Sequence, residues 1–273
     1  MSDARPRLIR IDLSPPEFIH VPQAPRIERH AILSRAPGNE WHMSGVSGLR
    51  EGVRVGVSNH TWSHLDAPYH LLPDGPTLDR IDPRRYLAVR TRVVDLTSTT
   101  PERRETIEGI GYHTRIARED LPSALDGFDA VLFVTGFSAT YAAGYPMRPG
   151  ADEHYPNITE EAAEQLAGIT TLRIVAIDAP SVDKPSNKAI AHRLFLGRRP
   201  NPVLLLETLT TERLRAHVRP LPSELLLTIE PLRAFGAQSD GALSSVYAYA
   251  AVAGEEAFFR SFVDAIVTAR LVS

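Results

Sequence analysis

Hydrophobic residues along the chain follow two patterns that predict β-strands. Short runs are either alternating or continuously apolar, and proline, glycine and serine bound most of them. Alternation is typical of a strand buried on one face, whereas a short continuous apolar run is typical of a strand buried on both faces. We therefore expect strands at residues 7–13, 52–58, 88–96, 130–136, 172–178, 202–207 and 224–229.

Helical patterns are fewer than strand patterns. The run Thr159 to Glu161 places a hydroxyl cap before two acidic residues, which are favourable near the positive end of a helix dipole. The tail of the chain repeats apolar residues at helical spacing, which predicts an amphipathic terminal helix. Helices are expected at residues 118–125, 159–166, 210–217 and 255–270. Strands interleaved with helices, and no internal repeat, predict a mixed α/β fold.

The composition is that of an ordinary globular protein. Hydrophobic residues make up 43% and charged residues 23%, and the formal net charge is −3 with no basic block. We therefore expect a small-molecule partner rather than nucleic acid or a membrane surface. The N-terminus lacks the apolar core of a signal peptide, and no run reaches the ~18 apolar residues of a membrane span. These features predict a cytoplasmic protein with a single domain, residues 1–273.

A dense histidine cluster directly follows the strand expected at residues 52–58. His60, His64, Asp66 and His70 lie close together in a chain with ten histidines. His64 and Asp66 are two residues apart, so they point to the same side of an extended segment, and His60 precedes them by one helical turn or a short loop. The chain has no cysteine, which leaves imidazole and carboxylate groups as the strong metal ligands. The spacing predicts a metal ion on the first three residues, with His70 near it to move protons.

Two more candidate ligands lie further along the chain. His192 follows a polar loop, and Glu207 ends an otherwise apolar strand. A carboxylate in that position is either solvated at the strand tip or held by a cation. Three protein ligands and a water form the usual catalytic zinc site. Both residues are therefore candidates to complete the metal centre.

The run from His60 to His70 resembles the signature of the bacterial kynurenine formamidase and cyclase family, in which the middle commonly reads Gly-Thr-His-x-Asp-x-Pro. Further matches follow in the same order at Ile11-Asp12-Leu13-Ser14, Thr135-Gly136, Tyr155-Pro156, Ile177-Asp178-Ala179-Pro180-Ser181-Val182-Asp183, His192 and Leu206-Glu207. The resemblance implies a swivelling β/β/α fold, with a mixed sheet and flanking helices. It also implies a homodimer or homotetramer that uses zinc, as one or two ions, or manganese to hydrolyse small amides or related cyclic substrates.

The same resemblance implies a role for each matching residue. The three candidate ligands from His60 to Asp66 would bind a first metal ion. Asp66 and Glu207 would bridge to a second ion, which His192 also binds. His70 matches the proton donor and acceptor of the family.

The chain departs from the family pattern beside these residues. Trp62 and Ser63 stand where the family usually has glycine and threonine, and Tyr247 stands where members often have arginine. Trp62 and Trp41 either line an aromatic substrate pocket or pack in the core. Phe137 begins an aromatic loop that either covers a substrate or packs against the body. The departures bear on the substrate more than on the metal.

Three functions are compatible with these residues. The leading hypothesis is an arylformamidase-like, metal-dependent hydrolase of a small amide that uses a metal-activated water. A second enzymatic hypothesis keeps the metal and has it open a lactone or lactam ring, or close a polyketide-type ring. A third is a non-catalytic metal-binding protein that has lost its pocket, for which Trp62 is the sequence support.

Overall fold

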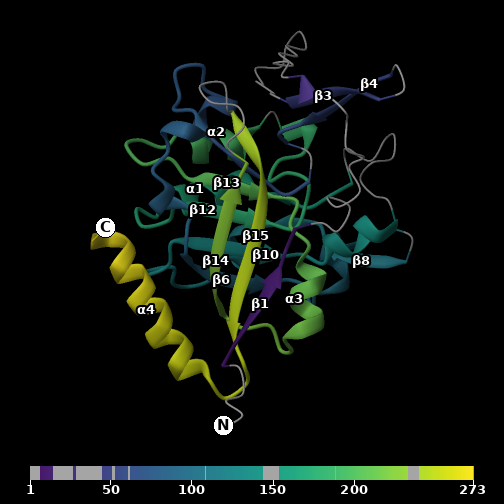
Figure 1. The fold of residues 1–273 in the computed structure, drawn as a ribbon. Helices are drawn as coiled ribbons and strands as arrows, with labels where there is room; N and C mark the ends of the chain where they lie inside the picture. The colour runs from purple at the N-terminus through teal and green to yellow at the C-terminus, as the bar shows by residue number, and fades with distance from the viewer. Residues whose placement is uncertain are drawn as a thin grey trace.

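A mixed eight-stranded sheet organises the molecule (Figure 1). The computed structural model describes residues 7–14, 27–28, 45–50, 53–60, 62–107, 109–143, 154–187, 189–232 and 240–272. Trp41 and the proline-spaced residues 15–25 lie outside these ranges. In spatial order the strands of the sheet are β1 (Leu8–Asp12), β15 (Gly241–Ala251), β14 (Glu224–Pro231), β6 (Val89–Asp95), β10 (Ala130–Val134), β12 (Ile174–Ile177), β13 (Leu204–Glu207) and β5 (His64–Asp66).

The sheet closes into a barrel through the short strand β5. This strand pairs antiparallel with β13 on one side and with the beginning of β15 on the other. Strand β1 pairs with the later part of β15 and lies outside the ring. Strands β6, β10, β12 and β13 run parallel to one another. Because parallel strands end at the same rim, the barrel brings residues that follow β10, β12 and β13 together beside β5.

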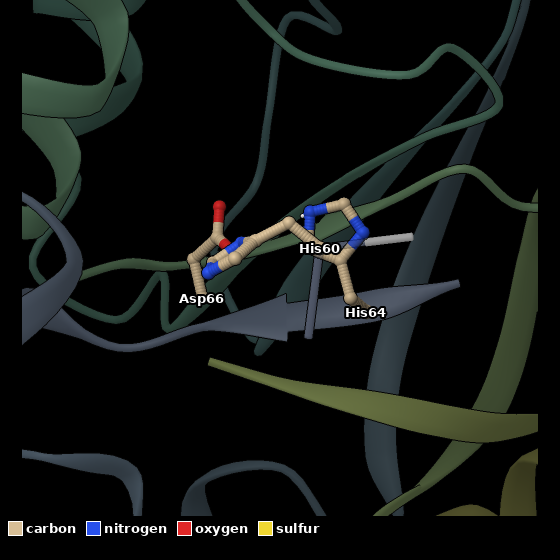
Figure 2. Close-up of side chains that lie close together, drawn as sticks. All are labelled: His60, His64 and Asp66. Carbon is tan, nitrogen blue, oxygen red and sulfur yellow. Dashed lines mark ion pairs between the residues drawn. The ribbon is translucent and has the colours of Figure 1, made fainter. Parts of the chain in front are cut away.

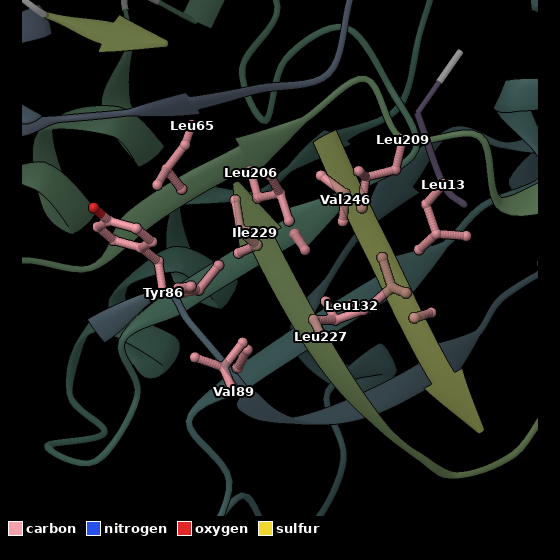
Figure 3. Packing of buried hydrophobic residues seen from close by; sticks show 14 of the residues in the cluster. Leu13, Leu65, Tyr86, Val89, Leu132, Leu206, Leu209, Leu227, Ile229 and Val246 are labelled. Carbon is pink, nitrogen blue, oxygen red and sulfur yellow. The ribbon is translucent and has the colours of Figure 1, made fainter. Parts of the chain in front are cut away.

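Side chains alternate between the inside of the barrel and its outer face. On β10, Leu132 belongs to the apolar cluster inside the barrel, whereas Val131 and Phe133 belong to a second apolar cluster. The inner cluster includes Leu65, Leu206 and residues of β14 and β15 (Figure 3). Both faces of β10, β12 and β13 are buried, which explains their continuously apolar sequences, whereas β6 alternates between buried and half-buried residues.

In the part of the chain that the structure describes, four α-helices flank the barrel: α1 (Glu160–Ala167), α2 (Ile190–Leu196), α3 (Thr211–His217) and α4 (Glu256–Val272). Helices α1 and α2 contribute Leu166 and Phe195 to the second apolar cluster. Helix α4 lies along the outside, where Phe259 and Val263 pack against Leu226 of β14 (Figure 1). No helix in the described part of the chain is long and apolar enough to span a membrane.

Three smaller sheets complete the described structure. They are formed by β2 (Ile27–Glu28), β3 (Gly45–Arg50) and β4 (Val53–Ser58), by β7 (Arg104–Ile107) and β8 (Ile110–His113), and by β9 (Arg115–Ile116) and β11 (Asn157–Ile158). The predicted α/β fold with a mixed sheet and flanking helices is confirmed. Every strand expected from the hydrophobic pattern is present, with its ends within two residues of the expected positions.

One expected helix is wrong, and several elements are additional. The helix expected at residues 118–125 is only a 3-10 turn, Arg118–Asp120. The Asp120 carboxylate accepts a hydrogen bond from Ala117 N, which closes the turn, and Pro122 disfavours helical geometry at the residue before it. The hairpin β7–β8, the long strand β15 and helix α2 carry no hydrophobic period strong enough to predict them.

Phe137 supports a prediction about stability. It is fully buried, and its ring centroid lies 5.0 Å from that of Tyr112 and 5.9 Å from that of Tyr141. Phe137→Ala is expected to lower the free energy of unfolding by about 3–5 kcal/mol, since it removes a large core side chain. Phe137→Leu should cost less than about 2 kcal/mol. Urea unfolding followed by circular dichroism measures both, and an unchanged stability with a raised KM would instead place the ring in the substrate pocket.

Candidate metal centre

The predicted histidine cluster forms a buried centre at the edge of the barrel. The chain leaves β4, and the Asn59 side chain donates a hydrogen bond to Gly241 O at 3.1 Å, which fixes the approach to His60. His64 and Asp66 then lie on β5 and are almost inaccessible to solvent. His60 Nδ1 lies 2.8 Å from Asp66 Oδ1. Figure 2 shows the side chains of His60, His64 and Asp66 close together. The three residues predicted as ligands therefore meet at one point.

The two distant candidate ligands reach the same centre. Glu207 ends β13 directly opposite His64, and His64 Nε2 lies 3.3 Å from Glu207 Oε2. His192, on α2, places Nε2 3.5 Å from Glu207 Oε1 and 3.5 Å from Asp66 Oδ2. Strand pairing and helix packing thus unite residues that are far apart in sequence.

Oxygen acceptors orient the three imidazoles toward the centre. His64 Nδ1 lies 2.7 Å from the Trp62 carbonyl, and His192 Nδ1 lies 2.7 Å from Asp183 Oδ2. In each case the other ring nitrogen, Nε2, faces the carboxylates of the centre. His60 is arranged the other way round: its Nε2 lies 2.8 Å from Asp240 Oδ2, and its Nδ1 faces Asp66. Metal-ligating histidines are typically held in this way, with one nitrogen donating to an oxygen and the other bound to the metal.

The burial of Asp66 and the distances around it show whether these residues fit a metal ion. The Asp66 side chain is fully buried, and the ring nitrogens of His60, His64 and His192 that lie 2.8 to 3.5 Å from its oxygens are not aligned for hydrogen bonds. Burying such a group is costly unless a cation or a donor compensates it. The distances of 3.3 to 3.5 Å from the Nε2 atoms of His64 and His192 to the carboxylates match the ~3.4 Å that separates tetrahedral ligands with bonds of ~2.1 Å. The donor set therefore fits a divalent cation.

The charges of the residues in the centre also favour a bound cation. Burial lowers the pKa of His60, but the carboxylates of Asp66 and Asp240 outweigh it and raise the pKa to about 10. Burial also opposes protonation of His192, but Glu207 and Asp183 raise its pKa to about 10. Burial would raise the pKa of the Asp66 carboxyl, whereas the neighbouring histidines bring it well below its usual range. The carboxylates of the centre thus favour positive charge beside them, as a site for a cation requires.

His70 lies beside this centre, as predicted. It is buried, and its ring stacks on that of His60 with centroids 4.0 Å apart. Burial and the charge of His60 bring the pKa of His70 below its ordinary value. Its Nδ1 lies 3.4 Å from Asp240 Oδ2. This contact favours the tautomer that donates from Nδ1 and leaves Nε2 able to accept a proton.

Asp240 is a residue of the centre that no sequence pattern indicated. This buried carboxylate contacts both His60 and His70, from a position just before β15. A side chain at the next residue, Gly241, would place Cβ 2.8 Å from His60 Cε1 and 3.0 Å from Leu65 O, so only glycine fits there. The pair Asp240-Gly241 before a strand was the one sequence feature that could have indicated this position. Nothing in the sequence connects it with His60, which lies 180 positions earlier.

Trp62 occupies an unusual backbone conformation. Its φ is +59°, in the left-handed region that glycine adopts most easily. This explains why glycine suits this position in the family that the motif resembles. A non-glycine residue in this region costs about 1 kcal/mol. The conformation directs the Trp62 carbonyl at His64 Nδ1, so the backbone keeps its role in the centre whatever the side chain does.

The residues predicted to line the substrate pocket lie in different parts of the structure. Trp62 is half-buried next to the centre, and its pocket role stays a prediction. Phe137 lies in the second apolar cluster, with the contacts of a core residue, and its pocket role also stays a prediction. Trp41 lies outside the described residues. Tyr247 pairs with Asp12 of β1, and the Arg10 guanidinium lies 5.0 Å from its ring centroid.

Comparison with known proteins identifies the family. Residues 11–184 match the cyclase family, described as Putative cyclase, and this segment includes His60, His64, Asp66 and His70. The match covers more than half of the chain, so the protein belongs to the cyclase family. The resemblance that the sequence motif indicated is thus confirmed.

Individual relatives agree with this assignment. The kynurenine formamidase of Bacillus cereus is 27% identical over 171 residues, which are 58% of this chain and 69% of that protein. The kynurenine formamidase of Bacillus anthracis is 27% identical over 151 residues, which are 52% of this chain and 60% of that protein. Each of these matches therefore spans only part of the relative.

Solved structures show the same fold. Isatin hydrolase A from Ralstonia solanacearum has a TM-score of 0.60 at 20% identity and covers 89% of this chain and 92% of its own. A potential metal-dependent hydrolase with cyclase activity has a TM-score of 0.56 at 20% identity, with 89% and 98% covered.

Proposed function

We propose that the protein is a metal-dependent hydrolase of a small amide, with arylformamidase-like activity and zinc as the cofactor. The observation that carries the proposal is the buried Asp66 carboxylate, surrounded by three imidazoles that are each oriented by an oxygen acceptor. Membership of the cyclase family and the similarity to kynurenine formamidases support the reaction class.

Each residue of the centre has a distinct task in this reaction. His60, His64 and Asp66 would hold one cation, and His192 and Glu207 would complete the centre or bind a second one with Asp66. A bound divalent cation polarises a carbonyl group and lowers the pKa of water to ~7. His70 is near the centre and in a suitable tautomer, so it would accept a proton at Nε2 and return it to the leaving nitrogen.

Metal analysis and a substrate panel test the proposal. The purified protein should contain zinc in a fixed ratio to chain, and it should hydrolyse formanilides at a rate that chelation abolishes and zinc restores. A protein that binds zinc stoichiometrically but turns over no member of the panel would instead be a non-catalytic metal-binding protein. A protein that hydrolyses formanilides without any metal would contradict the proposal directly.

A ring-opening activity is the second candidate. The same attack on the carbonyl of a cyclic amide opens the ring, and two isatin hydrolases share this fold over most of their length. Including isatin-like lactams and simple lactones in the panel separates the candidates by kcat/KM. Preference for a lactam over the formanilides would assign ring opening, with the same metal centre.

Asp240 gives a prediction about orientation within the centre. Asp240→Asn keeps the size of the side chain but removes the charge that holds His60 Nε2 and His70 Nδ1. We expect roughly 10- to 100-fold weaker metal binding or turnover, the usual effect of losing a group that orients a ligand. Zinc competition with a chromogenic chelator and steady-state kinetics measure the two effects. Asp79→Asn, at an exposed carboxylate, is the control, and wild-type values for Asp240→Asn would remove Asp240 from the site.

A further inference from the structure

A cavity lies at the end of the barrel opposite the metal centre. It has a volume of about 550 Å³, within the range of small-ligand sites. Its walls come from residues just before β6, β10, β12 and β13, that is, from the amino ends of the parallel strands. Glu207 lies at the other end of β13, so this cavity and the metal centre are at opposite ends of the same strands.

Arginine side chains dominate the cavity. Arg84, Arg85, Arg173 and Arg198 line it, together with two carboxylates, Asp82 and Asp129. The cavity thus carries an excess of positive charge in a chain whose net charge is −3. Such a concentration of guanidinium groups in one cavity needs either structural partners or an anion to stabilise it.

Two of the arginines lack a carboxylate partner. Asp82 pairs with Arg84 at 2.6 Å, and Asp129 pairs with Arg173 at 3.2 Å. Among the described residues, neither Arg85 nor Arg198 forms an ion pair with a carboxylate. Their hydrogen bonds go to neutral oxygens: Arg85 donates to Asn201 Oδ1 at 3.1 Å and to Pro202 O, and Arg198 donates to the carbonyl oxygens of Ala167, Ile169, Leu172 and Asn201. Neutral oxygens accept hydrogen bonds from several of these donors, but no carboxylate of the described residues lies within ion-pair distance of either guanidinium.

The guanidinium of Arg85 is affected by the neighbouring arginines. Its Nε is buried and has no hydrogen-bond partner among the described residues. Burial and the positive charges of Arg173 and Arg198 lower the pKa of its guanidinium. A buried donor in a cavity with an excess of positive charge, which Asp82 offsets only in part, is the environment that a bound oxyanion stabilises, because an oxyanion supplies both the acceptor and the charge.

We propose that this cavity binds a small oxyanion with at least two negative charges, such as the phosphate group of a small molecule, through Arg85, Arg173 and Arg198. Planar guanidinium groups match phosphate and carboxylate oxygens in pairs, which favours oxyanions over halide ions. The site is separate from the proposed hydrolytic centre and does not depend on its activity.

Isothermal titration calorimetry with inorganic phosphate, and separately with citrate, tests the proposal on the full chain. The wild-type protein should show saturable binding that sodium chloride at equal ionic strength does not reproduce, and the stronger of the two ligands identifies the preferred oxyanion. Arg85→Gln and Arg173→Gln should each weaken this binding roughly tenfold or more, because each removes a charged donor. Arg215→Gln, which changes an arginine paired with Glu212 on α3, is the control and should bind like wild type.

The titrations are done with metal-free and zinc-loaded protein, because phosphate can also bind a metal ion. Circular dichroism confirms that the variants are folded. Binding that requires zinc, or that is unchanged in both folded arginine variants, would place the anion at the metal centre and overturn the proposal. Absence of saturable binding by wild type to both phosphate and citrate would overturn it as well.

Discussion

Asp66→Ala is expected to remove the bound metal and to lower turnover by on the order of a thousandfold or more, the loss of the several kcal/mol that a metal supplies to the transition state. The reason is the central position of this carboxylate. One of its oxygens faces His60 and His64, and the other faces His192. Glu207, by comparison, faces two of these histidines, His64 and His192.

Zinc content measured by mass spectrometry and kcat on the best panel substrate check this prediction. Asp79→Ala, at an exposed aspartate, is the matched control and should retain both metal and activity. Circular dichroism distinguishes loss of metal from loss of fold. If folded Asp66→Ala kept a full complement of zinc, the assignment of the metal centre to this cluster would be wrong.

His70→Ala is expected to separate proton transfer from metal binding. Turnover should fall by about 10²- to 10⁴-fold, the usual contribution of a general acid–base residue. Zinc content should stay close to that of wild type, because the other ring nitrogens and carboxylates already provide enough ligands. KM should change little if His70 acts on the proton rather than on substrate binding.

His217→Ala provides the comparison for this experiment, since His217 is exposed on α3. His70→Gln fills more of the buried space, so a similar result from both variants excludes a packing defect as the cause. Equal loss of zinc and turnover in both variants would move His70 from proton transfer to metal binding. Such a result would fit the geometry in which His70 lies near Asp66 and His192.

The sequence predicted the local parts of this centre because they depend on short spacings. His64 and Asp66 are two residues apart on a strand, so their side chains share a face wherever the strand is placed. The continuous apolar runs of β10, β12 and β13 predicted strands buried on both faces, as the two apolar clusters show. Glu207 was a candidate because a carboxylate at the end of such a run is either solvated or held by a cation.

Asp240 and the arginine cavity show what local patterns could not predict. Asp240 precedes a strand whose serines and alternating small residues carry no strong hydrophobic period. It reaches His60 only because β15 pairs with β5 and closes the barrel. The arginines come from three separate loops, each unremarkable alone, which the parallel strands bring to one end of the barrel.

The sequence by itself therefore determined which residues are candidate metal ligands and which family motif they form, because ligand type and short spacing are local properties. The tertiary structure decided which nitrogen of each histidine faces the metal centre and which carboxylate orients it. It also decided that the Trp62 carbonyl contacts His64 Nδ1, because the backbone of Trp62 adopts a left-handed conformation. These features depend on strand pairing and barrel closure between segments up to 180 residues apart, and no local pattern specifies such contacts.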